Sequence, residues 1–103
     1  MNTLKAAYRI LNALEHKDRE RAISAQIGPA AIGMEQADWL EVMQSLLDEG
    51  YITGVKIITD ILGETSVDMR QARITLKGAE YLHENSAMKK IADLAADIIS
   101  IVK

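Results

Sequence analysis

Two histidines are the side chains best suited to acid–base or metal chemistry at neutral pH, and each stands next to a glutamate. His16 follows Glu15 in a charged connector, and His83 precedes Glu84 near the expected end of a helix. Neither pair has a further group at the spacing that a zinc site or a catalytic triad needs. The chain contains no cysteine, which excludes thiolate nucleophiles and cysteine-bound metals. The pattern favours surface histidines, and we expect no enzyme activity, cofactor or metal.

A second chemical candidate is the glycine spacing from Gly28 to Gly33, which matches that of a phosphate-binding loop. Met34-Glu35 follow where such a loop carries the lysine and hydroxyl residue that touch the nucleotide. The segment also follows no predicted strand. We therefore discard a nucleotide site.

The charge distribution is more informative than the net charge of −3. Residues 34–50 contain acidic but no basic side chains, and most of this segment is expected to form a helix. Its polar face is predicted to carry Asp38, Glu41, Ser45, Asp48 and Glu49. A stripe of carboxylates is repelled by DNA phosphates, so this face favours a solvated surface or contact with a basic protein over DNA reading. Asp38 and Glu41 are the candidate partner-binding residues.

The segment that follows is predicted to form an antiparallel hairpin with its tip at residues 62–65. Four apolar residues precede or enter the tip: Ile57, Ile58, Ile61 and Leu62. Strict alternation along a strand cannot bury all of them on one face. We expect an exposed apolar patch, typical of protein contact, with Ile58 and Leu62 as candidate contacts. The alternative is that the hairpin packs against a helix.

A basic surface is the alternative site, and it would favour nucleic acid. The candidate residues for this surface are Arg9, Arg19, Arg21, Arg70 and Arg73. Folding would have to bring Arg9, Arg19 and Arg21 to the base of the hairpin, where Arg70 and Arg73 are expected. Glu15, Asp18 and Glu20 interleave with the first group and weaken its field, so scattered solvated cations are the simpler interpretation.

The last predicted helix, from Ala87 to about Val102, carries a wide apolar stripe. It is too short for an independent coiled coil, so it is expected to pack on its own domain, on a second copy, or on both. The candidate self-association residues are Met88, Ile91, Leu94, Ala95, Ile98, Ile101 and Val102. No run of apolar residues is long enough to span a bilayer, so no membrane partner is expected.

The remaining elements follow from apolar periodicity and capping residues. A first helix is predicted at 4–15 with its stripe on Leu4, Ala7, Tyr8, Leu11 and Leu14. One short helix is expected within 22–33; Ser24 could cap it, and Gly28-Pro29 should break or restart it. The next helix should run from Met34 or Glu35 to Glu49 and end at Gly50, with Leu40, Met43, Leu46 and Leu47 buried and Trp39 at the margin. Strands are predicted at 51–61 and 66–74, and Thr75 should cap a helix at 76–84.

The predicted elements are a helix that ends at a glycine, a strand, a wing, a second strand and a helix. This order predicts a winged-helix domain of the α+β class. The motifs "LLDEGYITGV" and "ARITLKGAEYLHENSAMKKI" carry a more specific resemblance. In combination they resemble the YjcQ-type family of small bacterial and phage proteins, over roughly the C-terminal two thirds of the chain. The resemblance implies a winged-helix fold of phage or prophage type, and it implies no defined activity.

The sequence thus predicts a winged-helix domain at 1–86 and a C-terminal helix at 87–103. The chain starts with an amphipathic pattern and has no apolar signal core, so we expect a cytoplasmic protein. The expected function is protein–protein interaction or a regulatory adaptor role, with a homodimer through the last helix as one arrangement. The alternative is a DNA-binding transcriptional regulator, which rests on analogy of fold.

Overall fold

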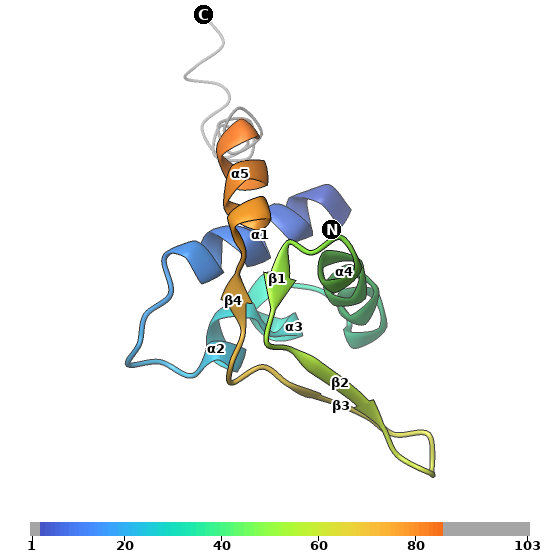
Figure 1. The fold of residues 1–103 in the computed structure, drawn as a ribbon. Coiled ribbons are helices and arrows are strands. Elements are labelled where there is room, and N and C mark those ends of the chain that lie inside the picture. Colours follow the sequence, from blue (N-terminus) through green and yellow to red (C-terminus); the bar gives the residue numbers. More distant parts are fainter. Residues whose placement is uncertain (1–2, 86–103) are drawn as a thin grey trace, which may run out of the picture.

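The computed structural model describes residues 3–85, which form a helical body with a projecting two-stranded wing (Figure 1). The mixed α+β, winged-helix-like architecture predicted from the sequence is confirmed. Its elements in chain order are α1 (Thr3–Glu15), α2 (Ile23–Ile27), α3 (Pro29–Ile32), α4 (Gln36–Asp48), β1 (Ile52–Thr53), β2 (Lys56–Thr59), β3 (Thr65–Asp68), β4 (Arg73–Ile74) and α5 (Leu76–Glu84).

Helix α1 lies at the centre of the body and packs against α2, α3, α4, α5 and β4. Because it has neighbours on several sides, its buried surface is wider than one stripe. Ala6 and Ile10 are fully buried together with Leu11, although only Leu11 belonged to the predicted face. Leu4, predicted to be buried, is 52% exposed at the first turn. The predicted stripe was therefore too narrow and wrong at its N-terminal end.

The segment between α1 and α4 contains two short helices, where the sequence pattern predicts one. Gly28 ends α2 and precedes α3, and Pro29 occupies the first turn of α3. Proline suits that position because its missing N–H would have no helical acceptor there. A Cβ at Gly28 would collide with the carbonyl of Ser24. Ser24 lies inside α2 and does not cap it; Ala22 precedes that helix without a side-chain cap.

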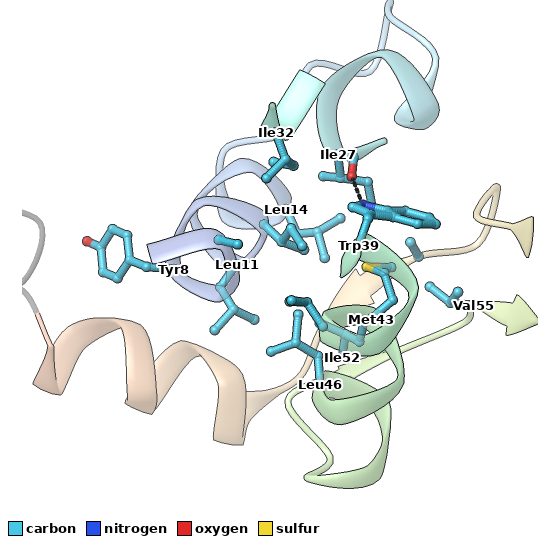
Figure 2. Close-up of a cluster of buried hydrophobic side chains, with 14 of the residues drawn as sticks. Tyr8, Leu11, Leu14, Ile27, Ile32, Trp39, Met43, Leu46, Ile52 and Val55 are labelled. Carbon is cyan, nitrogen blue, oxygen red and sulfur yellow. Dashed lines mark hydrogen bonds between the residues drawn. The ribbon is translucent and has the colours of Figure 1, made fainter. Parts of the chain in front are cut away.

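Helix α4 brings Trp39 into the core, which corrects its predicted place at the margin. The indole is 1% exposed, and its N–H donates to the carbonyl of Ile27 in α2 at 2.8 Å (Figure 2). A buried Trp needs such an acceptor, and α2 supplies it. Val42 is also buried, whereas Leu40 and Leu47 are only half-buried. Gly50 follows the helix with φ of 76°, as the predicted glycine stop requires.

The core is one apolar cluster to which both helices and strands contribute (Figure 2). Within the described part of the chain no buried polar side chain belongs to it, apart from the polar tips of Trp39 and Tyr8. The buried residues are Ala6, Tyr8, Ile10, Leu11, Leu14, Ile27, Ile32, Trp39, Val42, Met43, Leu46, Ile52, Val55, Ala72 and Leu82.

Each of the two long predicted strands is divided into two short ones. β1 pairs with β4 next to the body, and β2 pairs with β3 in the wing, both antiparallel. Gly54 divides the first strand, because its φ of 81° turns the chain between β1 and β2. A Cβ there would overlap the carbonyl of Gln71 on the returning chain. Glycine is therefore required for both conformation and space.

The wing ends in a tight turn at residues 60–64, earlier than predicted. The amide of Asp60 donates to the Glu64 carbonyl at 2.9 Å, and the amide of Gly63 donates to the Asp60 carbonyl at 3.0 Å. The Asp60 carboxylate accepts from the amides of Leu62 and Glu64, each at 2.9 Å. With Gly63 at φ of 83°, this is a three-residue hairpin loop with a glycine bulge. β2 therefore stops at Thr59, and Ile61 belongs to the loop.

Helix α5 begins as predicted at a Thr75 cap. The Thr75 hydroxyl accepts from the Gly78 amide at 3.0 Å and donates to the Gly50 carbonyl at 2.6 Å. It therefore joins the start of α5 to the glycine that ends α4. Tyr81 of α5 stacks on Tyr51, with ring centroids 4.9 Å apart.

The proposed last helix at 87–103, and with it the expected division into two domains, lies outside the described residues. No helix within residues 3–85 has the length and hydropathy required to cross a membrane.

Candidate functional site

The wing tip presents the two most exposed large apolar side chains of the described residues. Ile61 is 92% exposed and Leu62 is 91% exposed. Both lie in the loop that the Asp60 carboxylate and Gly63 hold in one conformation. The tip therefore displays adjacent apolar side chains from an ordered turn, at the end of the ribbon most distant from the body (Figure 1).

The two faces of the wing differ in burial. Ile57 and Val67, which are cross-strand partners, pack partly against the core. Ile58 lies on the opposite face, opposite Ser66, and is 53% exposed. The expected exposure of Ile58 and Leu62 is therefore found. Ile61 was part of the predicted apolar group but not a named contact, and the flanking Asp60 and Gly63 are the turn signal that could have identified it.

The acidic face of α4 also lies in solvent. Asp38 and Glu41 are exposed and line a shallow concavity of about 410 Å³ beside the start of α1. Asp48 is exposed and accepts a hydrogen bond from the Gln44 amide at 2.9 Å. This helix holds the place where a winged-helix protein usually reads DNA, and its surface carries carboxylates.

Three of the five arginines proposed for nucleic-acid contact come together at the base of the wing. Arg19, Arg21 and Arg70 line a concavity of about 290 Å³, together with Lys17, Asp18 and Ile23. Arg9 does not line it, and its guanidinium donates to the Ile32 carbonyl at 3.5 Å. Arg73 lies in β4 opposite Thr53 and is also absent from this concavity. The predicted basic surface is therefore smaller than the sequence allowed.

An ion pair occupies one side of the basic concavity. The Arg70 guanidinium contacts both carboxylate oxygens of Asp68, at 3.1 and 3.0 Å, and the Arg70 amide donates to the same carboxylate at 3.1 Å. These hydrogen bonds to the Arg70 side chain and backbone lower the pKa of Asp68 to about 2. Asp68 is therefore ionised at every physiological pH and partly neutralises Arg70.

A larger groove of about 590 Å³ adjoins this concavity and runs between β3 and the start of α2. Arg21, Ile23 and Arg70 line both hollows. The floor of the groove is largely apolar, with Ile23, Ile58, Val67 and Met69 among its lining residues. No sequence pattern predicts this groove, because it forms between segments more than forty residues apart in the chain.

The two histidines do not form a site in the described residues. His16 lies in an exposed position, where its Nδ1 is 3.0 Å from the Asn12 carbonyl, and His83 is exposed on α5. No group of three or more metal-ligating side chains gathers within residues 3–85.

Comparison with protein families agrees with the resemblance carried by the sequence motifs. The family model described as YjcQ protein matches residues 8–100. The chain belongs to the YjcQ family. No curated protein matches it, and no solved structure matches it. The description of the family gives no activity, so the surfaces described above carry the functional argument.

Proposed function

We propose that this member of the YjcQ family is a non-enzymatic protein-interaction module, a regulatory adaptor that binds its partner through the wing. The observation that carries the proposal is the ordered wing tip with Ile61 and Leu62 more than 90% exposed. Because hydrogen bonds to Asp60 already hold the turn, its backbone loses little further conformational entropy on binding, and the two side chains bury apolar surface when a partner covers them.

The charge of α4 supports a protein partner over DNA. In the usual docking of a winged helix, the helix before the wing enters the major groove. Here that helix presents Asp38, Glu41 and Asp48 to solvent, and the exposed Glu49 follows its last residue. Bringing these carboxylates between two phosphate strands is electrostatically unfavourable.

Substitutions at the tip test this proposal. The doubly substituted chain Ile61→Glu, Leu62→Glu keeps the turn, because the turn is held by Asp60 and Gly63, and it removes the apolar contact. Leu76→Glu is the matched control, since Leu76 is 86% exposed on α5 and lies outside the wing. Tagged versions of the three chains are used to recover partners from the native cell and to measure their affinity.

We expect one partner to bind the original chain and the Leu76→Glu variant with equal affinity. Its affinity for the tip variant should be at least about tenfold lower, a loss of about 1.4 kcal/mol in binding free energy. Equal binding of one partner by all three chains would contradict a role for the tip. Loss of binding in the Leu76→Glu variant alone would indicate that the partner contacts α5 and not the wing tip.

The alternative function, a DNA-binding regulator, is favoured by one observation: Arg19, Arg21, Arg70 and Lys17 surround one concavity. It predicts duplex binding that weakens steeply between about 50 and 200 mM salt, because phosphate contacts release counterions. Replacing Arg19 with Glu should then weaken binding on every duplex sequence tested. No duplex binding at the lower salt concentration would remove this alternative.

A further inference from the structure

The groove between β3 and α2 is bordered by the edge of a strand. Its lining includes three consecutive residues of β3, Ser66, Val67 and Asp68, and continues with Met69 and Arg70 beyond the strand. A strand that turned a face to the groove would line it with alternate residues, since side chains alternate between faces. β3 therefore meets the groove with its backbone edge.

The register identifies which backbone groups point to that edge. Hydrogen-bonded and non-hydrogen-bonded pairs alternate along an antiparallel ladder. The Asp60 amide donates to the Glu64 carbonyl at 2.9 Å, so the next hydrogen-bonded pair is Ile58 with Ser66. The pair Ile57 and Val67 then directs its N–H and C=O groups outward.

The outward groups of Val67 are available for pairing. In the two-stranded wing sheet, β2 is the only neighbour of β3 within residues 3–85. No hydrogen bond from the outward N–H or C=O of Val67 to another described element is found, and the hydrogen bonds that follow along the chain are local, from the Arg70 amide to the Asp68 carboxylate and from the Ala72 amide to the Met69 carbonyl. An open strand edge of this kind can accept another strand.

The charged end of the groove favours an acidic partner. Asp68 is bound to Arg70, and the charged side chains that line the groove and the adjoining concavity comprise four cations and two carboxylates: Lys17, Arg19, Arg21, Arg70, Asp18 and Asp68. The cations keep spare donors. Arg19 makes no hydrogen bond or ion pair with another described residue, and Arg21 donates only to the Ala25 carbonyl, at 3.3 Å.

We propose that the groove binds an extended acidic peptide segment of a partner protein, which adds as a third strand to the outer edge of β3. Its backbone pairs with the N–H and C=O of Val67. An apolar side chain of the peptide lies over Ile23 and Ile58, and its carboxylates meet Arg21 at the end of the groove and Arg19 in the adjoining concavity. This inference rests on the proposed function and names the chemical class of the partner, an acidic segment with β-branched residues.

The test uses the full chain and a fluorescent short peptide, acetyl-Glu-Glu-Val-Thr-Val-Thr-amide, with binding followed by fluorescence polarisation. Two peptide variants separate the contributions. In one, lysines replace the glutamates, and we expect binding at least about tenfold weaker, because charge-assisted hydrogen bonds are lost. In the other, alternate backbone nitrogens are methylated in both possible registers, and we expect at least about fivefold weaker binding, because strand pairing needs those N–H groups.

Protein variants locate the site without disturbing the fold. Arg19→Glu should weaken binding of the acidic peptide at least about tenfold, since the attraction between Arg19 and a peptide carboxylate becomes a repulsion. Arg73→Glu makes the same charge change at an exposed position outside the groove and should leave the affinity within about twofold.

Equal binding of the methylated peptides would overturn strand addition, and equal binding of the lysine peptide would overturn acidic selectivity. Absence of binding by the acidic peptide, or tighter binding of a duplex oligonucleotide that displaces it from Arg19, would overturn the whole inference. If the peptides fail while the wing-tip variants still lose their partner, the groove proposal fails and the proposed function stands. If the tip variants also bind normally, both fail.

Discussion

Gly54 and Gly63 form a matched pair that tests how the wing is set against the body. Both glycines have a positive φ, 81° and 83° respectively. Around Gly63 a new Cβ would meet nothing within 4 Å, whereas at Gly54 it would overlap the carbonyl of Gln71. Replacing each with alanine therefore imposes the same backbone strain and differs only in the steric overlap.

The expected magnitudes follow from these two terms. A left-handed alanine costs about 1–2 kcal/mol at either position, and the reduced entropy of the unfolded chain offsets the same small amount in both. The overlap with the Gln71 backbone adds about 1–3 kcal/mol, as overpacking typically does. We expect Gly63→Ala to lower the free energy of unfolding by about 1 kcal/mol and Gly54→Ala by about 2–4 kcal/mol.

Urea unfolding followed by fluorescence of the buried Trp39 measures both free energies, and the slope of each transition reports whether the unfolding remains comparable. Equal losses for the two variants would refute the reasoning, because they would show that the returning chain at Gln71 does not constrain Gly54. A greater loss for Gly63→Ala would refute it more strongly.

Three further predictions concern the contacts that hold the domain. Trp39→Phe should lower the free energy of unfolding by about 1–3 kcal/mol, because an α2 carbonyl loses its donor and the core loses volume; urea unfolding measures it. Thr75→Ala should cost about 1–2 kcal/mol in the same assay, and Thr75→Ser should restore most of it, since only the hydroxyl makes the cap. The carboxyl resonance of Asp68 should titrate near pH 2, because Arg70 stabilises its charged form. Because the pKa of Asp68 is depressed, the contribution of the Asp68–Arg70 ion pair to the free energy of unfolding is present above about pH 4 and is lost as the pH falls through about 2. Asp68→Asn should abolish this pH dependence of stability.

The sequence predicts those elements whose signals are local. Gly50 as a helix stop and Thr75 as a helix cap are short-range features, and both are found in place. The exposed carboxylates on α4 follow from helical periodicity alone. The same local reasoning led to continuous strands through Gly54, because the overlap that requires glycine there comes from Gln71, seventeen residues further along.

The position of Trp39 and the groove depend on contacts between segments distant in the chain, which the sequence does not show. Burial of the indole requires an acceptor for its N–H, which the α2 carbonyl of Ile27 supplies. The Gly28-Pro29 pair predicts a break in the helix, and the break is found there, but the sequence does not show that the Ile27 carbonyl lies beside Trp39. The groove depends on Arg21 and Arg70 lying close together, which is a property of the folded chain. The wing tip was closer to prediction, because Asp60 and Gly63 flank its apolar pair in the sequence.

The most direct test of wing-mediated protein binding uses the absence of cysteine from the chain. A single cysteine at Leu62→Cys attaches a photoreactive cross-linker to the tip alone, and Leu76→Cys does the same on α5 as a control. The partner recovered with the original chain is then mixed with each labelled chain and irradiated. The proposal predicts a cross-linked protein adduct from the tip and little or none from α5. Equal adducts from both positions, or a tip adduct formed only with DNA, would contradict it.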